Sequence, residues 1–203
     1  MPTIGYNSGV QRIAQTDPDD ESRVQEFDTL FKAPLWIDIA HHEIHEGDSF
    51  SVIASDTAAA ATDTAQIYIK TAAAATPQKR HHLTLSHYGS GEHSVVITEG
   101  ITFTSGGAAF VPVNRRRDSA KTTSSQAVRV GGDNLTGGVL QYTGGTAIWT
   151  ELIGSGRGTG GTTRGIEEWI LDANTGYIFE IIAVAAGGIG VGISANWYEH
   201  TDG

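Results

Sequence analysis

The feature that most constrains the fold of this chain is a series of short segments, from residue 34 onward, in which apolar and polar residues alternate. Leu35, Ile37 and Ile39 occupy every second position of one segment, and Ile67 and Ile69 do so in another. Residues two apart point to the same face of a β-strand, so this period places the apolar side chains together. The segments are separated by Gly-rich turns. This pattern predicts an all-β fold, an antiparallel β-sandwich or a barrel.

The predicted strands cover most of the chain after residue 34. We place them near residues 35–40, 49–54, 66–71, 82–88, 94–98, 108–113, 138–142, 147–152, 177–184 and 190–198. No helical segments of about 10 to 15 residues alternate with them, which excludes an α/β architecture. Glycine accounts for 26 of the 203 residues, a share that suits many turns, and the length is sufficient for one domain with its own core.

The first part of the chain differs from the rest. The stretch TDPDDESRVQEFD holds six acidic residues and one arginine and shows no strand period. We therefore predict an extended N-terminal arm over residues 1–33, followed by the sandwich domain over residues 34–203. Within the arm, a short helix near residues 20–31 is a local alternative, since Asp19 or Asp20 could cap it.

Three apolar residues of the arm, Ile4, Ile13 and Phe27, are candidate anchors. The arm has too few apolar residues to bury them by itself. It is either a frayed terminus or a segment that orders against a partner, in which case these anchors contact that partner or a neighbouring subunit.

Charge and composition exclude several classes of function. The formal net charge is −10, which argues against direct binding of nucleic acid, because phosphate contacts need clustered Lys and Arg. The chain has no cysteine, so neither a disulfide nor a thiolate metal site can form. The longest apolar run, at residues 181–193, is too short and too rich in glycine to cross a bilayer. We expect no membrane partner, and the N-terminal residues do not have the pattern of a signal peptide.

The stretch HHEIHEGDSF, at residues 41–50, is the strongest candidate for a metal site. On a strand, His41, Glu43 and His45 would share one face and offer N and O ligands of the kind that zinc uses. His81 and His87, which share a face of a later segment, are candidates to complete such a site. The spacing matches neither HExxH nor the cupin pattern. We therefore predict a strand end and turn in which His41 and His45 make edge or subunit hydrogen bonds, with no cofactor and no tightly bound metal.

Two loops stand out between the strands. The segment NRRRDSAKTTSSQ, at residues 114–126, is basic and rich in hydroxyl groups, and we interpret Arg115, Arg116 and Arg117 as candidates for contacts with acidic surfaces. The segment GSGRGTGGTTRG lacks the Gly-Lys-Ser/Thr ending of a phosphate-binding loop. No GxSxG element and no assignable pair of catalytic carboxylates is present, so we predict that the chain is not an enzyme.

Several segments occur in an order that resembles a known group of proteins. They are HHEIHEGDSF, TEGITF, NRRRDS, EEWILDANTGYIFEI and ANWYEHTDG. Together, over residues 34–203, they resemble small head proteins of tailed bacteriophages, of the capsid decoration (cement) type. The resemblance implies a jelly-roll-like sandwich and a non-enzymatic structural role on the capsid exterior of the virion, in a protein made in the host cytoplasm. It also implies two partners, the major capsid protein and the chain itself, with the chain forming a homotrimer.

Two other classes of function remain open. One is a receptor-binding or glycan-binding domain of a phage tail or fibre, which predicts binding to the host surface. The other is a metal-dependent β-sandwich enzyme, which predicts a tightly bound metal that is lost when His41 or His45 is substituted.

Overall fold

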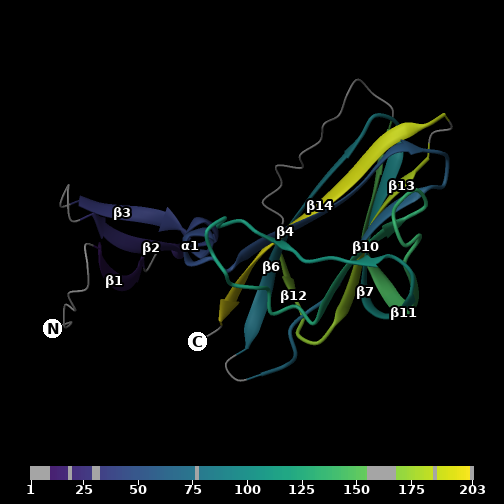
Figure 1. The fold of residues 1–203 in the computed structure, drawn as a ribbon. Helices are drawn as coiled ribbons and strands as arrows, with labels where there is room; N and C mark the ends of the chain where they lie inside the picture. Colours follow the sequence, from purple (N-terminus) through teal and green to yellow (C-terminus); the bar gives the residue numbers. More distant parts are fainter. Residues whose placement is uncertain are drawn as a thin grey trace.

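Two antiparallel sheets packed face to face form the main body of the protein (Figure 1). The computed structural model describes residues 10–17, 20–28, 33–75, 78–154, 168–184 and 187–201. Sheet 1 has five strands in the order β12-β6-β14-β4-β9. Its strands are β4 (Ser49–Ala59), β6 (Lys79–Gly89), β9 (Val113–Asn114), β12 (Trp169–Leu171) and β14 (Ile189–Thr201).

Sheet 2 has six strands in the order β11-β7-β13-β5-β10-β8. Its strands are β5 (Thr64–Lys70), β7 (His93–Ser105), β8 (Ala108–Ala109), β10 (Ala127–Gly132), β11 (Gln141–Ile153) and β13 (Gly176–Ala183). Every pairing in both sheets is antiparallel. The predicted antiparallel β-sandwich is therefore confirmed.

The order of the strands is that of a jelly roll. Among the eight strands that carry this order, the first pairs with the last, β4 with β14, and the second with the second last, β5 with β13. In the same way β6 pairs with β12, and β7 pairs with β11. A hairpin of strands folded over itself in this manner gives two four-stranded sheets that face each other. The strands β8, β9 and β10 extend these sheets at one side.

The main core fills the space between the two sheets. Phe50 and Trp197 project from sheet 1, Tyr177 and Phe179 project from sheet 2, and all four are nearly inaccessible to solvent. The rings of Phe50 and Trp197 lie 5.8 Å apart. Because the interior is filled by side chains of this size, the alternation in the sequence fixes which face of each strand is buried.

A second apolar cluster covers the other face of sheet 2. It contains Tyr68, Ile101, Leu140 and Ile178. Strand β13 is consequently buried on both faces, which is why its sequence GYIFEIIA is nearly continuous in apolar residues instead of alternating.

The N-terminal part forms a small sheet of its own. Its order is β1-β2-β3, with β1 at Val10–Asp17, β2 at Asp20–Asp28 and β3 at Ala33–Asp38. Figure 1 shows this sheet to one side of the sandwich, with the helix α1 (Ile39–Glu46) between the two. The short helix considered near residues 20–31 is wrong: the residues there that the structure describes belong to β2, whose pairing with both neighbours overrides local helix propensity.

Several predicted strand boundaries also change. The predicted strand 35–40 ends at Asp38, where the chain enters α1. The predicted strand 108–113 is reduced to the two short strands β8 and β9, with Pro112, which has no N–H to donate, between them. The predicted strands 138–142 and 147–152 are one strand, β11, that begins at Gln141. The other predicted strands lie in β4, β5, β6, β7, β13 and β14.

In the described part of the chain, no helix is long and apolar enough to cross a membrane.

Candidate functional site

The histidine-rich stretch is a helix and not the predicted strand end. Helix α1 covers Ile39–Glu46 and is followed by Gly47, whose φ of 80° suits a residue without a side chain. Gly47 N donates to Ile44 O at 3.1 Å and Asp48 N donates to Glu43 O at 2.9 Å, which is the pair of bonds of a Schellman C-cap. The Gly-Asp pair that we interpreted as a turn between strands therefore ends a helix.

The helix changes which histidines are neighbours. On a strand, His41, Glu43 and His45 would share a face; on α1, Glu43 is buried and the two histidines are exposed one turn apart. The rings of His41 and His45 stack at 4.9 Å. Glu43 instead accepts a hydrogen bond from Nδ1 of His200, at 3.2 Å, which ties the helix to β14.

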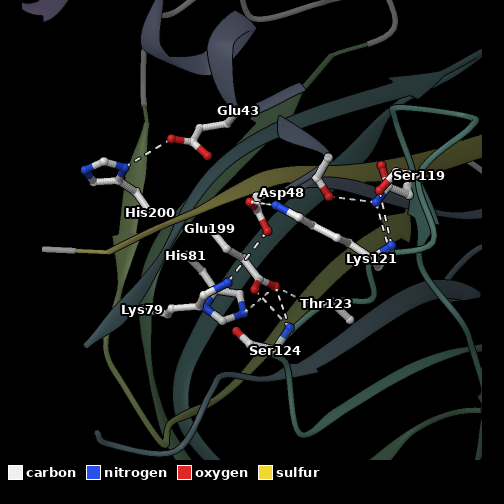
Figure 2. A network of polar contacts seen from close by, with 12 residues as sticks. Glu43, Asp48, Lys79, His81, Ser119, Lys121, Thr123, Ser124, Glu199 and His200 are labelled. Carbon is white, nitrogen blue, oxygen red and sulfur yellow. Dashed lines mark hydrogen bonds and ion pairs between the residues drawn. The ribbon is translucent and has the colours of Figure 1, made fainter. Parts of the chain in front are cut away.

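Polar contacts hold the loop at residues 114–126 on the sandwich (Figure 2). Asn114 Nδ2 donates to Gly47 O at 2.8 Å. Lys121 Nζ donates to Asp48 Oδ2 at 2.6 Å, and Lys79 lies 3.6 Å from the other carboxylate oxygen. Most residues of this segment are exposed, as a surface connection predicts, and these contacts fix it between the end of α1 and the edge of sheet 1.

The centre of this arrangement is a buried carboxylate on the last strand. Glu199 is 3% exposed and accepts hydrogen bonds from Thr123 Oγ1, from Ser124 N at 2.9 Å and from Trp197 Nε1 at 3.3 Å. His81, on the neighbouring strand β6, is paired with Glu199 in the sheet register, and its Nε2 lies 3.5 Å from the carboxylate. We call Glu199, His81 and residues 123–125 the Glu199 network.

Ser125 brings a possible nucleophile into this network. Its Oγ lies 2.8 Å from His81 Nε2, and it lines a groove of about 360 Å³ between residues 109–112 and residues 123–129. In a Ser-His-acid triad the acid binds the imidazole nitrogen that the serine does not use. Here Ser125 and Glu199 both approach Nε2. The arrangement therefore differs from that of a Ser-His-acid triad, and the contacts of Glu199 with Thr123 and Ser124 hold the loop on the sandwich.

Burial governs the electrostatics of the histidines that face inward. The pKa of His81 is lowered by its burial, and the negative charge of Glu199 acts in the opposite direction. The pKa of His87 is also lowered by burial, against the opposing effect of Glu151. Both imidazoles therefore favour the neutral form more than a histidine in water does.

The structure brings together two of the residues predicted to make contacts. Arg116 donates from Nη1 to the backbone carbonyl of His45, and its Nε donates to Asp118 at 2.9 Å. Arg115 and Arg117 are exposed on the same loop. The basic loop and the histidine helix therefore form one continuous surface beside the N-terminal sheet.

The structure describes the strand positions of two of the three predicted anchors of the arm. Ile4 lies outside the described residues. Ile13 is in β1 and Phe27 is in β2, where Phe27 is paired with Gln11 and Pro34.

Sequence reasoning missed the Glu199 network. His81 was considered only as a metal ligand, and Glu199, directly after the predicted strand 190–198, was given no role. The sequence contains one indication of this network: His81 lies on the apolar face of its strand, together with Leu83. A histidine in that position needs a buried polar partner.

Comparison with protein-family models, with curated proteins and with solved structures finds no match for this chain. Inferences about its function therefore rest on the residues and contacts described above.

Proposed function

We propose that this chain is a non-enzymatic structural protein of a tailed-phage virion, which decorates the capsid exterior and stabilises it. Its partners would be the major capsid protein and further copies of the chain, arranged as a homotrimer. The ordered set of sequence segments supports the phage assignment, and the jelly-roll order agrees with it, since this fold is common among viral capsid proteins. A fold alone does not fix a function, so the argument depends on the parts that the fold presents.

The observation that carries the proposal is the separate N-terminal sheet. It spans residues 10–38, whereas units shorter than about 40 residues rarely fold alone without a disulfide, a metal or an oligomeric partner. The chain has no cysteine to supply a disulfide. Within one chain the sheet contacts α1, through β2 and β3. A capsid or a neighbouring subunit that binds this arm would supply a partner of that kind.

The junction between this sheet and the sandwich suits the same role. Glu43 ties α1 to β14, and Arg116 and Asn114 tie the 114–126 loop to α1 and its C-cap. The arm is thus joined to the sandwich by a braced helix and not by a free linker. Weak contacts made by each copy would then add up over a shell that repeats the same site many times.

The test is co-assembly. The chain is co-expressed with the major capsid protein of the genome that encodes it, and the shells are separated from free protein by sedimentation and imaged by cryo-electron microscopy. We expect the chain to sediment with the shells in a fixed ratio and to give three-fold density on their outer surface. A chain that stays in the supernatant, or density on the tail alone, would contradict a role in decorating the capsid.

A variant pair sharpens the test. Arg115 and Arg117 are exposed, so their joint replacement by serine leaves the fold intact and is expected to weaken binding to shells if the basic loop contacts an acidic surface. The matched control is Lys70→Ser, which removes a charge from β5 in the opposite sheet. If both variants are retained on shells to the same extent, the basic loop does not contribute to binding of the shell.

One observation favours the glycan-binding alternative. On the outer face of sheet 1, the rings of His82 and Tyr198 stack at 4.6 Å, and both residues contact Glu168 Oε1 at 2.6 Å. An aromatic ring can pack on the apolar face of a sugar, and a neighbouring carboxylate can accept hydrogen bonds from the sugar hydroxyl groups. Binding of the purified chain to immobilised host glycans, abolished by Tyr198→Ala, would favour a receptor-binding domain over a capsid protein.

A further inference from the structure

Two histidines and a glutamate lie close together in the sandwich. Along β6, they lie near the opposite end of the strand from His81 and the Glu199 network. His87 comes from β6 in sheet 1, and His93 and Glu151 come from β7 and β11 in sheet 2. His87 Nε2 lies 3.7 Å from Glu151 Oε2, and the ring centres of His87 and His93 are 5.7 Å apart. His87 is 7% exposed and His93 is fully buried.

These three residues hold most of the unpaired buried polar atoms in the described part of the chain. There, six buried side-chain nitrogen or oxygen atoms have no hydrogen-bond partner, and four of them belong to this cluster: both ring nitrogens of His87, His93 Nε2 and Glu151 Oε2. Burying such atoms without a partner is costly, so their concentration at one point indicates an occupant that satisfies them together.

The chemistry of the four atoms identifies the kind of occupant. His93 Nδ1 lies 2.7 Å from the carbonyl oxygen of Gly91, which can only accept a hydrogen bond, so Nδ1 carries the proton and Nε2 of the neutral ring presents a lone pair. Glu151 presents a carboxylate oxygen. A neutral His87 ring has one nitrogen with a lone pair and one N–H group. Each of the three residues therefore presents one lone-pair atom, namely His93 Nε2, one ring nitrogen of His87 and Glu151 Oε2, and a cation can bind all three.

We propose that a divalent transition-metal ion of the zinc type binds between His87, His93 and Glu151. Two imidazoles and one carboxylate are a common zinc ligand set, and a ligating histidine usually donates its other N–H to a carbonyl, as His93 does. Ligand atoms about 2.0–2.1 Å from a tetrahedral zinc ion lie about 3.4 Å from each other, so His87 Nε2 and Glu151 Oε2, which are 3.7 Å apart, need to approach by a few tenths of an ångström.

Binding requires one movement. As the side chains stand, no group of three or more His, Asp or Glu residues in the described ranges could hold a metal ion. Glu151 Oε2 is already buried beside His87 although the side chain as a whole is 38% exposed, so a small rotation of this side chain brings the oxygen closer, and the ion has a route from solvent. The bound ion would tie sheet 1 to sheet 2 in a chain that has no disulfide to do so. This inference does not depend on the proposed capsid role.

The test uses the full chain, freed of metal with a chelator, and zinc chloride alone as the probe. Titration calorimetry at pH 7.5 is expected to give one ion per chain, with a rise in the thermal midpoint. Glu151→Gln, a change at a partly exposed position, is expected to weaken the affinity at least about tenfold, and His93→Asn is expected to remove binding. Affinity is also expected to fall as the pH drops below about 6.5, because protons compete for the imidazoles.

The control is the other histidine pair. His41 and His45 stack one turn apart on α1 and are exposed, so they are the natural competitor for zinc. The double variant His41→Ala/His45→Ala is expected to keep the site. The proposal is overturned if this double variant abolishes zinc binding, if Glu151→Gln binds zinc as tightly as the original chain, or if the original chain binds no zinc.

Discussion

The buried carboxylate of Glu199 gives the sharpest prediction about stability. The side chain is 1% exposed and accepts hydrogen bonds from Thr123, Ser124 and Trp197. Replacing it with glutamine keeps the shape, removes the charge and points an amide N–H₂ group at donors. A bond to a charged group contributes about 1.5–3 kcal/mol and a neutral one about 0.5–1.5 kcal/mol, so each of three bonds loses about 1 kcal/mol.

We expect Glu199→Gln to lower the free energy of unfolding by about 2–3 kcal/mol, after allowance for the lower cost of burying a neutral group. Glu199→Leu is expected to cost more, about 3–5 kcal/mol, because it leaves the donors with no acceptor at all. The control is Lys121→Met on the same loop. Lys121 is half exposed, and its ion pair with Asp48 is expected to contribute at most about 1 kcal/mol.

The measurement is urea unfolding, with the free energy extrapolated linearly to water. Hydrogen exchange at the Ser124 amide, which donates to Glu199, reports separately on the loop and is expected to speed up in Glu199→Gln but not in Lys121→Met. If both variants lower the free energy of unfolding by the same amount, below about 1 kcal/mol, the carboxylate does not anchor the loop and the reasoning is refuted.

Three further outcomes are expected. Folding lowers the pKa values of His81 and His87 below the value near 6.5 that a histidine has in the unfolded chain. Below about pH 6.5 the unfolded chain therefore binds more protons than the folded chain, and the free energy of unfolding should fall as the pH drops from about 6.5 towards 5.5. Above about pH 7 these two groups should not affect the free energy of unfolding. Urea midpoints across that range check this, and His87→Gln should flatten the slope; an unchanged slope contradicts it. Trp197→Ala should cost about 3–5 kcal/mol through the cavity it leaves, whereas Val111→Ala, at a position 82% exposed, should change stability by less than about 0.5 kcal/mol, both measured by urea unfolding. Removing residues 1–38 should leave the melting temperature of the sandwich nearly unchanged but weaken its retention on shells, and retention equal to that of the full chain would show that the arm makes no contact there.

The sandwich could be predicted from the sequence because period-2 alternation is a local signal that each strand carries by itself. Segments such as the one around Ile67 and Ile69 needed only their own residues to reveal a strand. The helix α1 could not be distinguished in this way, since its eight residues are too few to show a helical period and its histidines fit either structure. Its end is fixed by Gly47 and Asp48, a pair that also suits a hairpin turn.

The candidate site was harder to predict for a different reason. Glu199 and His81 become neighbours only through the register of β14 on β6, which follows from the order of strands in sheet 1 and not from either segment alone. The same holds for His87, His93 and Glu151, which come from three strands in two sheets. A histidine on an apolar face indicates that a partner is needed, but the sequence does not say which one.

The jelly-roll order has a consequence for biosynthesis. Strand β14 lies in the middle of sheet 1, between β4 and β6, yet it follows both of them in the chain and leaves the ribosome after them. Until residues 189–201 have left the ribosome, β4 and β6 have no strand that pairs with both of them. Their apolar side chains also lack Ile193 and Trp197 as neighbours in the core. Folding of the sandwich is therefore expected to follow translation, slowly, as is usual when contacts join distant parts of a chain. Without residues 189–201 sheet 1 would be split in two, so the sandwich cannot be completed until these residues have been translated.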